Sequence, residues 1–543
     1  MKKRAWVCFF LILGGLYSAS SPGALAEDPA LMNERMPEIT PPPLRSALLE
    51  EILPENAVLS PYDSSIAMET KIYQDGEKVS EYVAEESVVF EGPDEYSQLE
   101  GITTFRGNNF RDASSYGTIP ADPGELEIVY TRKISGIDSW SGVGWTGQAS
   151  AVRWPEQTRN IMNIYDEKKA KQDLVEVIYA TLDGHIYFYD LEDGEPTRDP
   201  INIGAPIKGS VTVDPRGYPL LYCGQGIDEV KGKSVEIGMR VFSLIDGSVL
   251  LFIDGHDKFA TRHWYASDCS PLVNADTDTL LWAGENGLFY RIKLNTDYNA
   301  AAKSISIDPV IDRYWYGSKV TTRPGMECSF SAYNHYVFLP DNSGLIQCLD
   351  VDAMQPVWAI DALDDTDSSP VLEIDEEGQL WLYTGSEFDL AKREYCYLRR
   401  INAFTGEESW CIELPCSNTH RGGTFATPAM GKGDVSDLIF YVESLTKQGT
   451  FLLAIEKETG EIRWKYDLGK YSWSSPVLCL DENEKAYLVE CNSGGLVRLF
   501  DASTGEVVAK CTVDGNVESS PIAFGDMLIV GTRASKIYGI QIK

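Results

Sequence analysis

Signatures of catalysis are scarce in this sequence of 543 residues. It holds only five histidines, and it lacks the motifs G-x-S-x-G, H-E-x-x-H and the phosphate-binding loop. No two cysteines are adjacent, and none are spaced as C-x-x-C. These absences exclude the sequence signatures of α/β-hydrolases, zincin proteases, P-loop nucleotide hydrolases, zinc ribbons and c-type haem proteins. The sequence therefore predicts no catalytic residue and no metal-ligand set.

Positive charge is also in short supply. Lys and Arg number 47 against 82 Asp and Glu, so the formal net charge is −35. An acidic surface repels phosphate backbones and anionic lipids, which argues against nucleic acid and membrane surfaces as partners. The excess of acid otherwise serves solubility and carries little information about the fold.

Long hydrophobic runs are absent beyond the first residues. Basic residues at 2–4 precede an apolar stretch at 7–16, and residues 24–26 read Ala-Leu-Ala, an A-x-A cleavage site. The apolar stretch is too short to span a bilayer. Cys8 lies inside it and not at the cleavage point, so no lipid anchor is predicted. We expect residues 1–26 to be a cleaved signal peptide and the mature chain to be secreted or extracytoplasmic.

Cysteine is sparse for an exported chain of this length. An even number remains after the signal peptide, which permits disulfides but not a disulfide scaffold. Most of these cysteines lie in apolar strand contexts and are interpreted as buried thiols. Cys411 and Cys416 flank one loop and are the best candidate pair.

Residues 27–100 differ in composition from the rest. Pro41-Pro42-Pro43, further prolines and many acidic residues are typical of a linker. We expect this segment to be a loosely ordered arm that precedes a domain at 101–543.

One short phrase recurs eight times between residues 148 and 521. A pair of small residues, usually followed by Pro, opens an apolar strand, and successive copies lie 40 to 61 residues apart. Periods of this length are typical of stacked supersecondary units. The clear copies are Cys269-Ser270-Pro271, Ser368-Ser369-Pro370, Ala426-Thr427-Pro428, Ser474-Ser475-Pro476 and Ser519-Ser520-Pro521, and the weaker ones are Gln148-Ala149-Ser150, Gly209-Ser210-Val211 and Cys328-Ser329-Phe330.

A second phrase ends the repeats: an apolar strand, then Asp-Ala or a related pair, then Thr-Gly and a Trp. Its copies lie at 401–410, 454–464 and 499–506, with a degenerate copy at 349–358. This plan resembles the PQQ-type (quinoprotein-like, BamB-like) β-propeller repeat. Phe105-Arg106-Gly107-Asn108 is similar to a segment that often opens such domains. The resemblance implies that three tryptophans dock between neighbouring blades and do not contact a ligand: Trp358, Trp410 and Trp464.

The repeats predict an all-β fold, an eight-bladed β-propeller of four-stranded antiparallel blades with an N-terminal extended arm. Seven blades is the alternative. The last repeat is one strand short, whereas the stretch at 126–131 has no repeat phrase before it. We therefore expect residues 126–131 to supply the missing outer strand and close the ring, which removes an exposed sheet edge.

Several linkers into the innermost strands carry Arg or aromatic residues. In a propeller such linkers gather around one mouth of the central channel. Arginines there offer paired N–H donors to a carboxylate, phosphate or acidic peptide. The alternative is that each Arg pairs with nearby acids and each aromatic covers a blade edge. The candidate mouth residues are Arg262, Arg323, Arg421, Trp145, Trp264 and Trp473.

Enzymes of the resembling family hold a quinone over the axis. The resemblance implies a calcium ion on carboxylate and amide side chains, a catalytic Asp, a stacking Trp and commonly a vicinal disulfide. This sequence has no Cys-Cys pair, and no single motif supplies the six to eight oxygens that calcium needs. A local acidic cluster is interpreted as a solvated turn: Asp361, Asp364, Asp365 and Asp367.

The first functional hypothesis is therefore an exported, non-enzymatic, monomeric propeller without a cofactor. It would act as a protein- or ligand-binding scaffold in the cell envelope or extracellular space. One alternative is a PQQ- and calcium-dependent oxidoreductase. Another is a carbohydrate- or anion-binding sensor module that uses the mouth. Since a fold alone does not determine function, the sequence leaves these three open.

Overall fold

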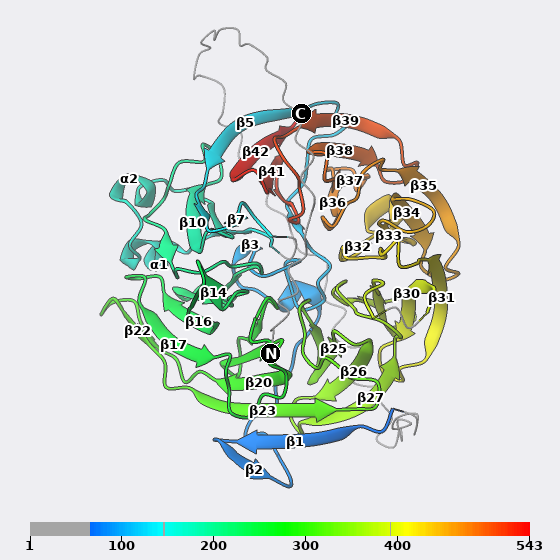
Figure 1. The fold of residues 1–543 in the computed structure, drawn as a ribbon. Helices are drawn as coiled ribbons and strands as arrows, with labels where there is room; N and C mark the ends of the chain where they lie inside the picture. The colour runs from blue at the N-terminus through cyan, green and yellow to red at the C-terminus, as the bar shows by residue number, and fades with distance from the viewer. Residues whose placement is uncertain (1–65, 145–146, 391–392) are drawn as a thin grey trace. The chain divides into compact units, whose positions relative to one another are not determined.

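The computed structural model describes residues 66–144, 147–390 and 393–543. They form eight antiparallel four-stranded blades around a central axis (Figure 1). The predicted eight-bladed all-β fold is confirmed, and the seven-bladed alternative is wrong. The predicted signal peptide at 1–26 and the first part of the arm lie outside the described residues.

Each blade runs from an inner strand at the axis to an outer strand at the rim, and we number the blades 1 to 8 along the chain. Blade 1 consists of β8 (Ser150–Arg153), β9 (Glu176–Ala180), β10 (His185–Asp190) and β11 (Ile201–Asn202), and blade 2 of β12 (Thr212–Val213), β13 (Leu220–Cys223), β16 (Gly238–Ser243) and β17 (Val249–Asp254). Blade 3 consists of β18 (Leu272–Asn274), β19 (Thr279–Ala283), β20 (Leu288–Lys293) and β23 (Val310–Gly317), and blade 4 of β24 (Ser331–Tyr333), β25 (Tyr336–Pro340), β26 (Leu345–Asp350) and β27 (Gln355–Asp361).

Blades 5 to 8 follow the same order. Blade 5 consists of β28 (Val371–Ile374), β29 (Leu380–Gly385), β30 (Tyr395–Asn402) and β31 (Glu408–Pro415), and blade 6 of β32 (Ala429–Met430), β33 (Leu438–Glu443), β34 (Phe451–Glu456) and β35 (Ile462–Asp467). Blade 7 consists of β36 (Val477–Leu480), β37 (Ala486–Cys491), β38 (Leu496–Asp501) and β39 (Val507–Thr512), and blade 8 of β40 (Ile522–Phe524), β41 (Met527–Thr532), β42 (Lys536–Ile542) and β5 (Leu126–Lys133).

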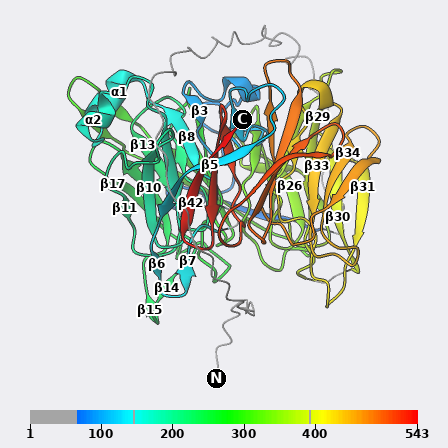
Figure 2. The ribbon, with the colours of Figure 1, turned by 90° about the horizontal axis from the view of Figure 1, so that it is seen from above.

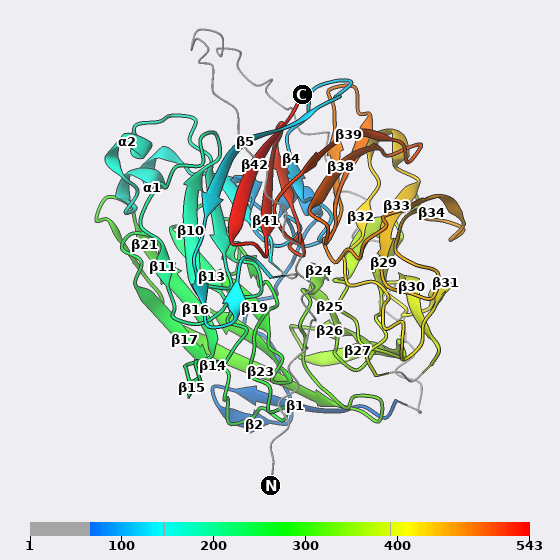
Figure 3. The same ribbon diagram turned by 45° about the horizontal axis from the view of Figure 1, so that its top comes forward.

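The ring closes through β5, which comes from the start of the domain. It pairs antiparallel with the C-terminal strand β42, with Thr131 opposite Tyr538 (Figure 3). The predicted role of residues 126–131 as the outer strand of the last blade is confirmed. Because the two ends of the domain share one sheet, the C-terminal strand β42 is paired on both sides and is not left at an edge.

The remaining elements are short. Two hairpins, β6 (Gly136–Ile137) with β7 (Trp140–Ser141) and β14 (Glu229–Val230) with β15 (Lys233–Ser234), project at the end of the axis opposite β3 (Figure 2). None of the helices among the described residues is long and apolar enough to cross a membrane. The others are β3 (Glu100–Ile102), β4 (Ser115–Tyr116), β21 (Asp297–Asn299), β22 (Ser304–Ser306), α1 (Glu156–Ile161), α2 (Asp166–Lys169) and the 3-10 turns Pro93–Glu95 and Gly433–Val435.

The described part of the arm is folded against blade 3. Strand β1 (Glu69–Gln74) pairs with the outer strand β23, and β2 (Glu77–Val79) pairs with β1. The Tyr82 hydroxyl donates to Asp312 Oδ2 at 2.6 Å, and Phe90 is buried in the core between blades 3 and 4. The expectation of a loosely ordered arm is therefore wrong for residues 66–100, because its apolar side chains are buried on the propeller.

A ring of hydrogen bonds surrounds the axis and uses the recurrent small-residue phrase. In four of the five clear copies the backbone N–H of the second small residue donates to the hydroxyl of the equivalent residue in the next blade. The donor–acceptor pairs are Gln148–Ser210 at 2.8 Å, Ser270–Ser329 and Ser329–Ser369 at 2.9 Å, Ser369–Thr427 at 3.2 Å, Thr427–Ser475 at 3.0 Å and Ser475–Ser520 at 3.1 Å. Ser270 Oγ donates to Ser210 O at 3.3 Å, and Ser520 N–H donates to Gly147 O at 2.9 Å, so every blade junction is bridged.

The tryptophans of the second phrase lie at three blade junctions. The indole N–H groups of Trp358, Trp410 and Trp464 donate to a backbone carbonyl of the following blade, at 2.9, 2.8 and 3.1 Å. Each indole also packs on the glycine of the next Thr-Gly turn, where a Cβ atom would come within 2.7 to 3.0 Å of the ring. The glycine is therefore required both by its positive φ and by the close approach of the ring.

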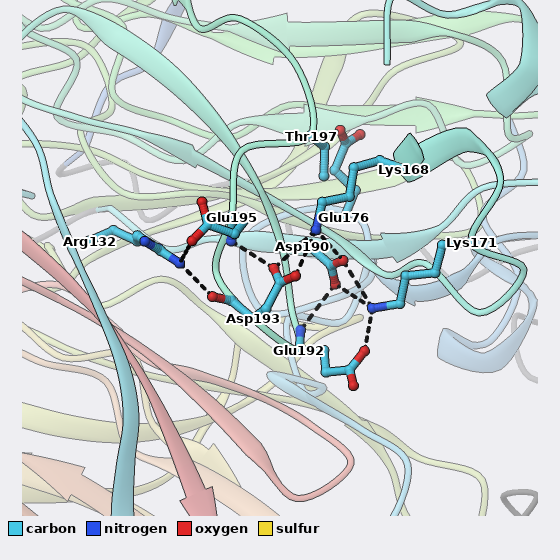
Figure 4. Close-up of polar contacts among 9 residues, drawn as sticks. All are labelled: Arg132, Lys168, Lys171, Glu176, Asp190, Glu192, Asp193, Glu195 and Thr197. Carbon is cyan, nitrogen blue, oxygen red and sulfur yellow. Dashed lines mark hydrogen bonds and ion pairs between the residues drawn. The ribbon is translucent and has the colours of Figure 1, made fainter. Parts of the chain in front are cut away.

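The helical insertion of blade 1 is held by an ion network (Figure 4). Lys168 and Lys171 each contact the buried carboxylate of Asp190, at 2.8 and 3.0 Å. On the other side Arg132 of β5 contacts Glu195 at 2.6 Å. The network thus fastens α2 to blade 1 and blade 1 to the closing strand of blade 8.

The described cysteines form no disulfide. The predicted pairing of Cys411 with Cys416 is not found, because the extended strand β31 separates the two residues. Cys416 instead lies beside Cys396 of β30, with the two Sγ atoms 3.3 Å apart and both side chains buried. The interpretation of most cysteines as buried thiols agrees with their burial.

Replacing Gly505 by Ala tests the tryptophan docking. We expect Gly505→Ala to lower the free energy of unfolding by about 2–4 kcal/mol, since it combines a left-handed φ with overpacking against Trp464. Gly469→Ala is the matched control, because its φ is +67° and nothing lies within 4 Å of its Cβ. It should cost only about 1–2 kcal/mol. Equal losses in denaturant titrations would contradict the docking role.

Oxidation of the mature chain tests the cysteine contact. We expect a disulfide between Cys396 and Cys416, which closes a loop of 20 residues and raises the free energy of unfolding by about 3 kcal/mol. Peptide mapping without reductant, with thermal melts before and after reduction, measures both effects. A bond from Cys416 to Cys411, or two free thiols after oxidation, would show the prediction to be wrong.

Candidate binding site at the channel mouth

One end of the central channel is filled by residues 103–116, which we call the plug. Its backbone and side chains bond to inner strands all around the ring, for example through Val213 N–H to Thr103 O, Leu372 N–H to Phe110 O and Ala523 N–H to Ser114 O. In Figure 2 the flanking strand β3 marks this end, and the β6–β7 and β14–β15 hairpins mark the other. The chain itself thus closes the axis at the plug end.

Two buried arginines anchor the plug: Arg106 of the predicted opening segment, and Arg111, which follows that segment. Arg106 donates to Pro476 O at 2.7 Å and to Pro428 O at 3.2 Å. Arg111 donates to Phe330 O at 2.7 Å and to Ser270 O at 2.9 Å. A guanidinium presents several donors in a fixed plane, so each arginine satisfies carbonyls of more than one blade.

A small pocket of about 10 Å³, enough for a water molecule, lies on the axis next to the plug. Phe105 of the plug lines it, together with hydroxyl-bearing residues of the central ring such as Ser329 and Thr427. Glu327 and Asp367 also line it, and they come from the linkers that lead into blades 4 and 5. Polar and apolar groups thus line the pocket together, and the two carboxyl groups among them are acidic.

A first acidic cluster on the rim consists of Asp268, Glu285 and Glu327, whose ligand oxygens lie within 4.8 Å of one another. The ammonium of Lys208 lies 3.0 Å from Asp268 and 3.3 Å from Glu327. Although burial lowers the pKa of Lys208, the carboxylates raise it well above its usual value. Burial, followed by the charge of Glu327, raises the pKa of Glu285 well above 4.5. Arg262 lies 3.6 Å from Glu285.

A second acidic cluster consists of Asp365, Glu387 and Asp389, again with ligand oxygens within 4.8 Å. Burial is the main cause that raises the pKa values of Asp365 and Glu387, and the mutual repulsion of the carboxylates adds to it. Asp367, next to this cluster, behaves alike, and its largest like-charge neighbour is Glu387. The mouth thus holds several carboxylates in places that disfavour their charge.

The structure places the predicted mouth arginines on the rim, each beside an acid. Arg323 and Arg421 both pair with Asp389, the latter at 3.0 Å, and Arg262 faces Glu285. These pairs match the alternative that arginines of an acidic protein neutralise neighbouring acids. An anion would have to compete with those carboxylates, so anion binding by the three arginines stays a prediction.

The predicted aromatic residues of the mouth differ in their exposure and in what they contact. Trp473 packs between Phe425 and Tyr471, with ring centroids 5.1 Å apart in both cases. Trp264 is 42% exposed and lies over the ammonium of Lys208 at 5.8 Å. Trp145 lies outside the described residues.

The sequence did not single out the acidic clusters as a site. Asp365 and Asp367 were noted but interpreted as a solvated turn, whereas both are buried at the mouth. The other members lie far apart along the chain, and in a sequence with 82 acidic residues none of them stands out. Only their place in the repeat could have indicated a site, because each of these residues directly precedes the small-residue phrase or follows the second strand of a blade.

These donors do not fit a quinone that carries several carboxylates. Such a cofactor on the axis would meet Glu327 and Asp367, and no basic side chain is among the described residues that line the pocket. Like charges at this distance repel strongly where water is partly excluded. We derive no reaction step through a quinone, and the expectation that no cofactor binds stays a prediction.

No family model and no curated protein matches this chain. Among solved structures, BamB from Moraxella catarrhalis is 15% identical, with 77% of this chain and 98% of that one covered and a TM-score of 0.47. Quinohemoprotein alcohol dehydrogenase ADHIIG from Pseudomonas putida HK5 is 11% identical, with 82% and 80% covered and a TM-score of 0.53. Quinohemoprotein alcohol dehydrogenase from Comamonas testosteroni is 11% identical, with 81% of this chain and 80% of that one covered and a TM-score of 0.50. At such identities the likeness shows the fold, a quinoprotein-like β-propeller.

Titration of Glu285→Gln tests the charge repulsion in the first cluster. Because the folded pKa of Glu285 is raised, the native state holds a proton that the unfolded state releases, and its contribution to stability is lost as the pH rises above about 4.5. The variant should therefore gain stability relative to the parent as the pH rises, at up to about 1.4 kcal/mol per pH unit.

The matched control is Glu461→Gln, an exposed turn residue far from the cluster. It removes one exposed negative charge outside the cluster and so measures the effect of the net charge alone. Denaturant titrations between about pH 4.5 and pH 8 measure both variants. The groups that face Glu285 are Asp268, Glu327, Lys208 and Arg262. If the stability difference between Glu285→Gln and the parent does not depend on pH, the folded protein does not disfavour the charged form of Glu285, and the prediction is wrong.

Proposed function

We propose that this chain is an exported, non-enzymatic β-propeller that acts as a binding scaffold and takes a positively charged group of its ligand at the channel mouth. The carrying observation is the excess of buried and half-buried carboxylates over basic groups at the open end of the axis. At the other end the plug satisfies the inner strands, so the mouth is the end from which a ligand can reach the axial pocket.

Electrostatics supports a cationic ligand group. The charges of Asp365, Asp367 and Glu387 are disfavoured by burial and by one another. A positive group that displaces water from the mouth relieves this repulsion. The net charge of −35 adds long-range attraction for basic ligands and raises their association rate at low salt.

The two alternatives from the sequence, a sensor module for an anion or carbohydrate and an oxidoreductase, use the same mouth. An anion would be held by Arg262, Arg323 and Arg421, and a carbohydrate would stack on Trp264 or Trp473. A PQQ- and calcium-dependent oxidoreductase would hold its quinone over the pocket. Each alternative has its own ligand class, so one panel of ligands separates them from the cationic ligand.

Calorimetric titration of the mature chain with oligolysine, oligoglutamate, a neutral oligosaccharide and PQQ with calcium tests the proposal. Of the four organic ligands we expect only oligolysine to bind, with an affinity that falls as salt rises from about 50 to about 500 mM because the Debye length shrinks. Glu327→Gln should weaken it about fivefold, which corresponds to about 1 kcal/mol for one partly exposed charge pair.

The control is Glu461→Gln, which removes the same charge from an exposed turn and should leave the affinity within about twofold. Equal losses in the two variants would indicate attraction to the net charge and not to the mouth. Saturable binding of PQQ with turnover of an alcohol, or preferential binding of oligoglutamate or the oligosaccharide, would overturn the proposal.

A further inference from the structure

The two acidic clusters of the mouth differ in one decisive respect. Both bring three carboxylates within 4.8 Å. In the first, the chain supplies the cation, since Lys208 inserts its ammonium between Asp268 and Glu327. In the second, Arg323 and Arg421 pair with Asp389, but no described lysine or arginine forms an ion pair with its other members, Asp365 and Glu387, or with the adjacent Asp367. The part of the second cluster around Asp365 and Glu387 therefore has the shape of a cation site whose cation is not part of the described chain.

Buried oxygens without a hydrogen-bond partner occur in both clusters, but only in the second is there no ammonium of a described residue beside them. Asp365 and Asp367 are only 6% and 7% exposed, and Oδ1 of each has no hydrogen-bond partner. The hydroxyl of Thr366, between them, is buried without a partner as well. Leaving a buried charged oxygen unpaired costs several kcal/mol, so natural proteins rarely keep such groups without a proton, a water or an ion.

The arginines at the rim do not meet this need. Arg323 and Arg421 form ion pairs only with Asp389, and both side chains are 45% exposed. The unsatisfied oxygens of residues 365–367 receive no hydrogen bond from either arginine. Two guanidinium charges on one carboxylate hold Asp389 in place but leave the other carboxylates uncompensated.

We propose that a calcium ion binds between the loop at 364–367 and the loop at 387–389 of blade 5, with Asp365, Glu387 and Asp389 as carboxylate ligands and Asp367 beside them. The donors are all oxygens, which selects a hard cation over zinc or copper. Calcium accepts six to eight oxygens in flexible geometry, whereas magnesium keeps most of its waters and usually takes one or two carboxylates.

The ion has a structural consequence for the mouth. Glu387 N–H donates to Asp365 O at 2.9 Å, and Leu390 N–H donates to Asp364 Oδ1 at 2.7 Å, so the two loops already touch. A calcium ion fixes their carboxylates as well and thereby fixes Asp389 with its two arginines. This inference rests on the proposed function only in placing positive charge at the mouth, and calcium is titrated without any partner.

Calorimetry and thermal melts of the EDTA-treated mature chain test the site. We expect one calcium per chain and a higher melting temperature with calcium. Asp365→Asn should weaken binding at least tenfold, since loss of an outer-shell partner alone costs about 10–100-fold. In EDTA the same variant should melt at or above the parent, because it removes a buried unpaired charge. This reversal separates a lost ligand from a folding defect.

The matched control is Glu377→Gln, an exposed acid in the first hairpin of the same blade, which should bind calcium like the parent. No heat and no melting shift up to about 10 mM calcium, beyond the weakest range of extracellular calcium modules, would overturn the site. So would equal affinity for magnesium or unchanged binding by Asp365→Asn. Oligolysine binding in EDTA reports separately on the proposed function: if it persists while calcium fails, only the calcium site is wrong.

Discussion

The ring of backbone-to-hydroxyl hydrogen bonds around the axis is the constraint on which the structure depends. Eight inner strands meet there, too close for large side chains, and each must satisfy its first N–H group. A Ser or Thr hydroxyl of the next blade does so at six of the eight junctions, as between Ser329 and Ser369 at 2.9 Å. Each junction adds about 1 kcal/mol, but the larger effect is to fix the register of every blade against the next.

The two ends of the axis follow from this ring in different ways. At one end the plug inserts Arg106 and Arg111, whose guanidinium groups bond to carbonyls of several blades. At the other end the linkers into the blades bring acidic residues together, and Lys208 compensates only one of the two clusters. The polar groups are thus satisfied by the chain at the plug and only partly satisfied at the mouth, which is where we propose that a ligand or ion binds.

The sequence predicted the fold well because the fold is repetitive. The small-residue phrase located the inner strands, the Thr-Gly-to-Trp phrase located the blade junctions, and the short last repeat identified residues 126–131 as the closing strand. The site was not predictable in the same way. Asp268, Glu327 and Glu387 come together only when the blades are arranged in space. Burial, which turns Asp365 from a solvated turn residue into a strained carboxylate, leaves no trace in local composition. The prediction of a loosely ordered arm was wrong for a similar reason, because Ile72 and Phe90 pack against strands that lie far from them in the sequence.

Hydrogen–deuterium exchange, read residue by residue, tests most directly whether the plug and the ring form one unit. The ring donors Ser329 and Ser475 and the plug amides that bond to the inner strands should exchange as slowly as the central blade strands, through global unfolding only. If residues 103–116 exchange fast while the blades stay protected, the plug is not part of the folded core. The axis would then be open at both ends, and the mouth would lose its claim to be the end that binds.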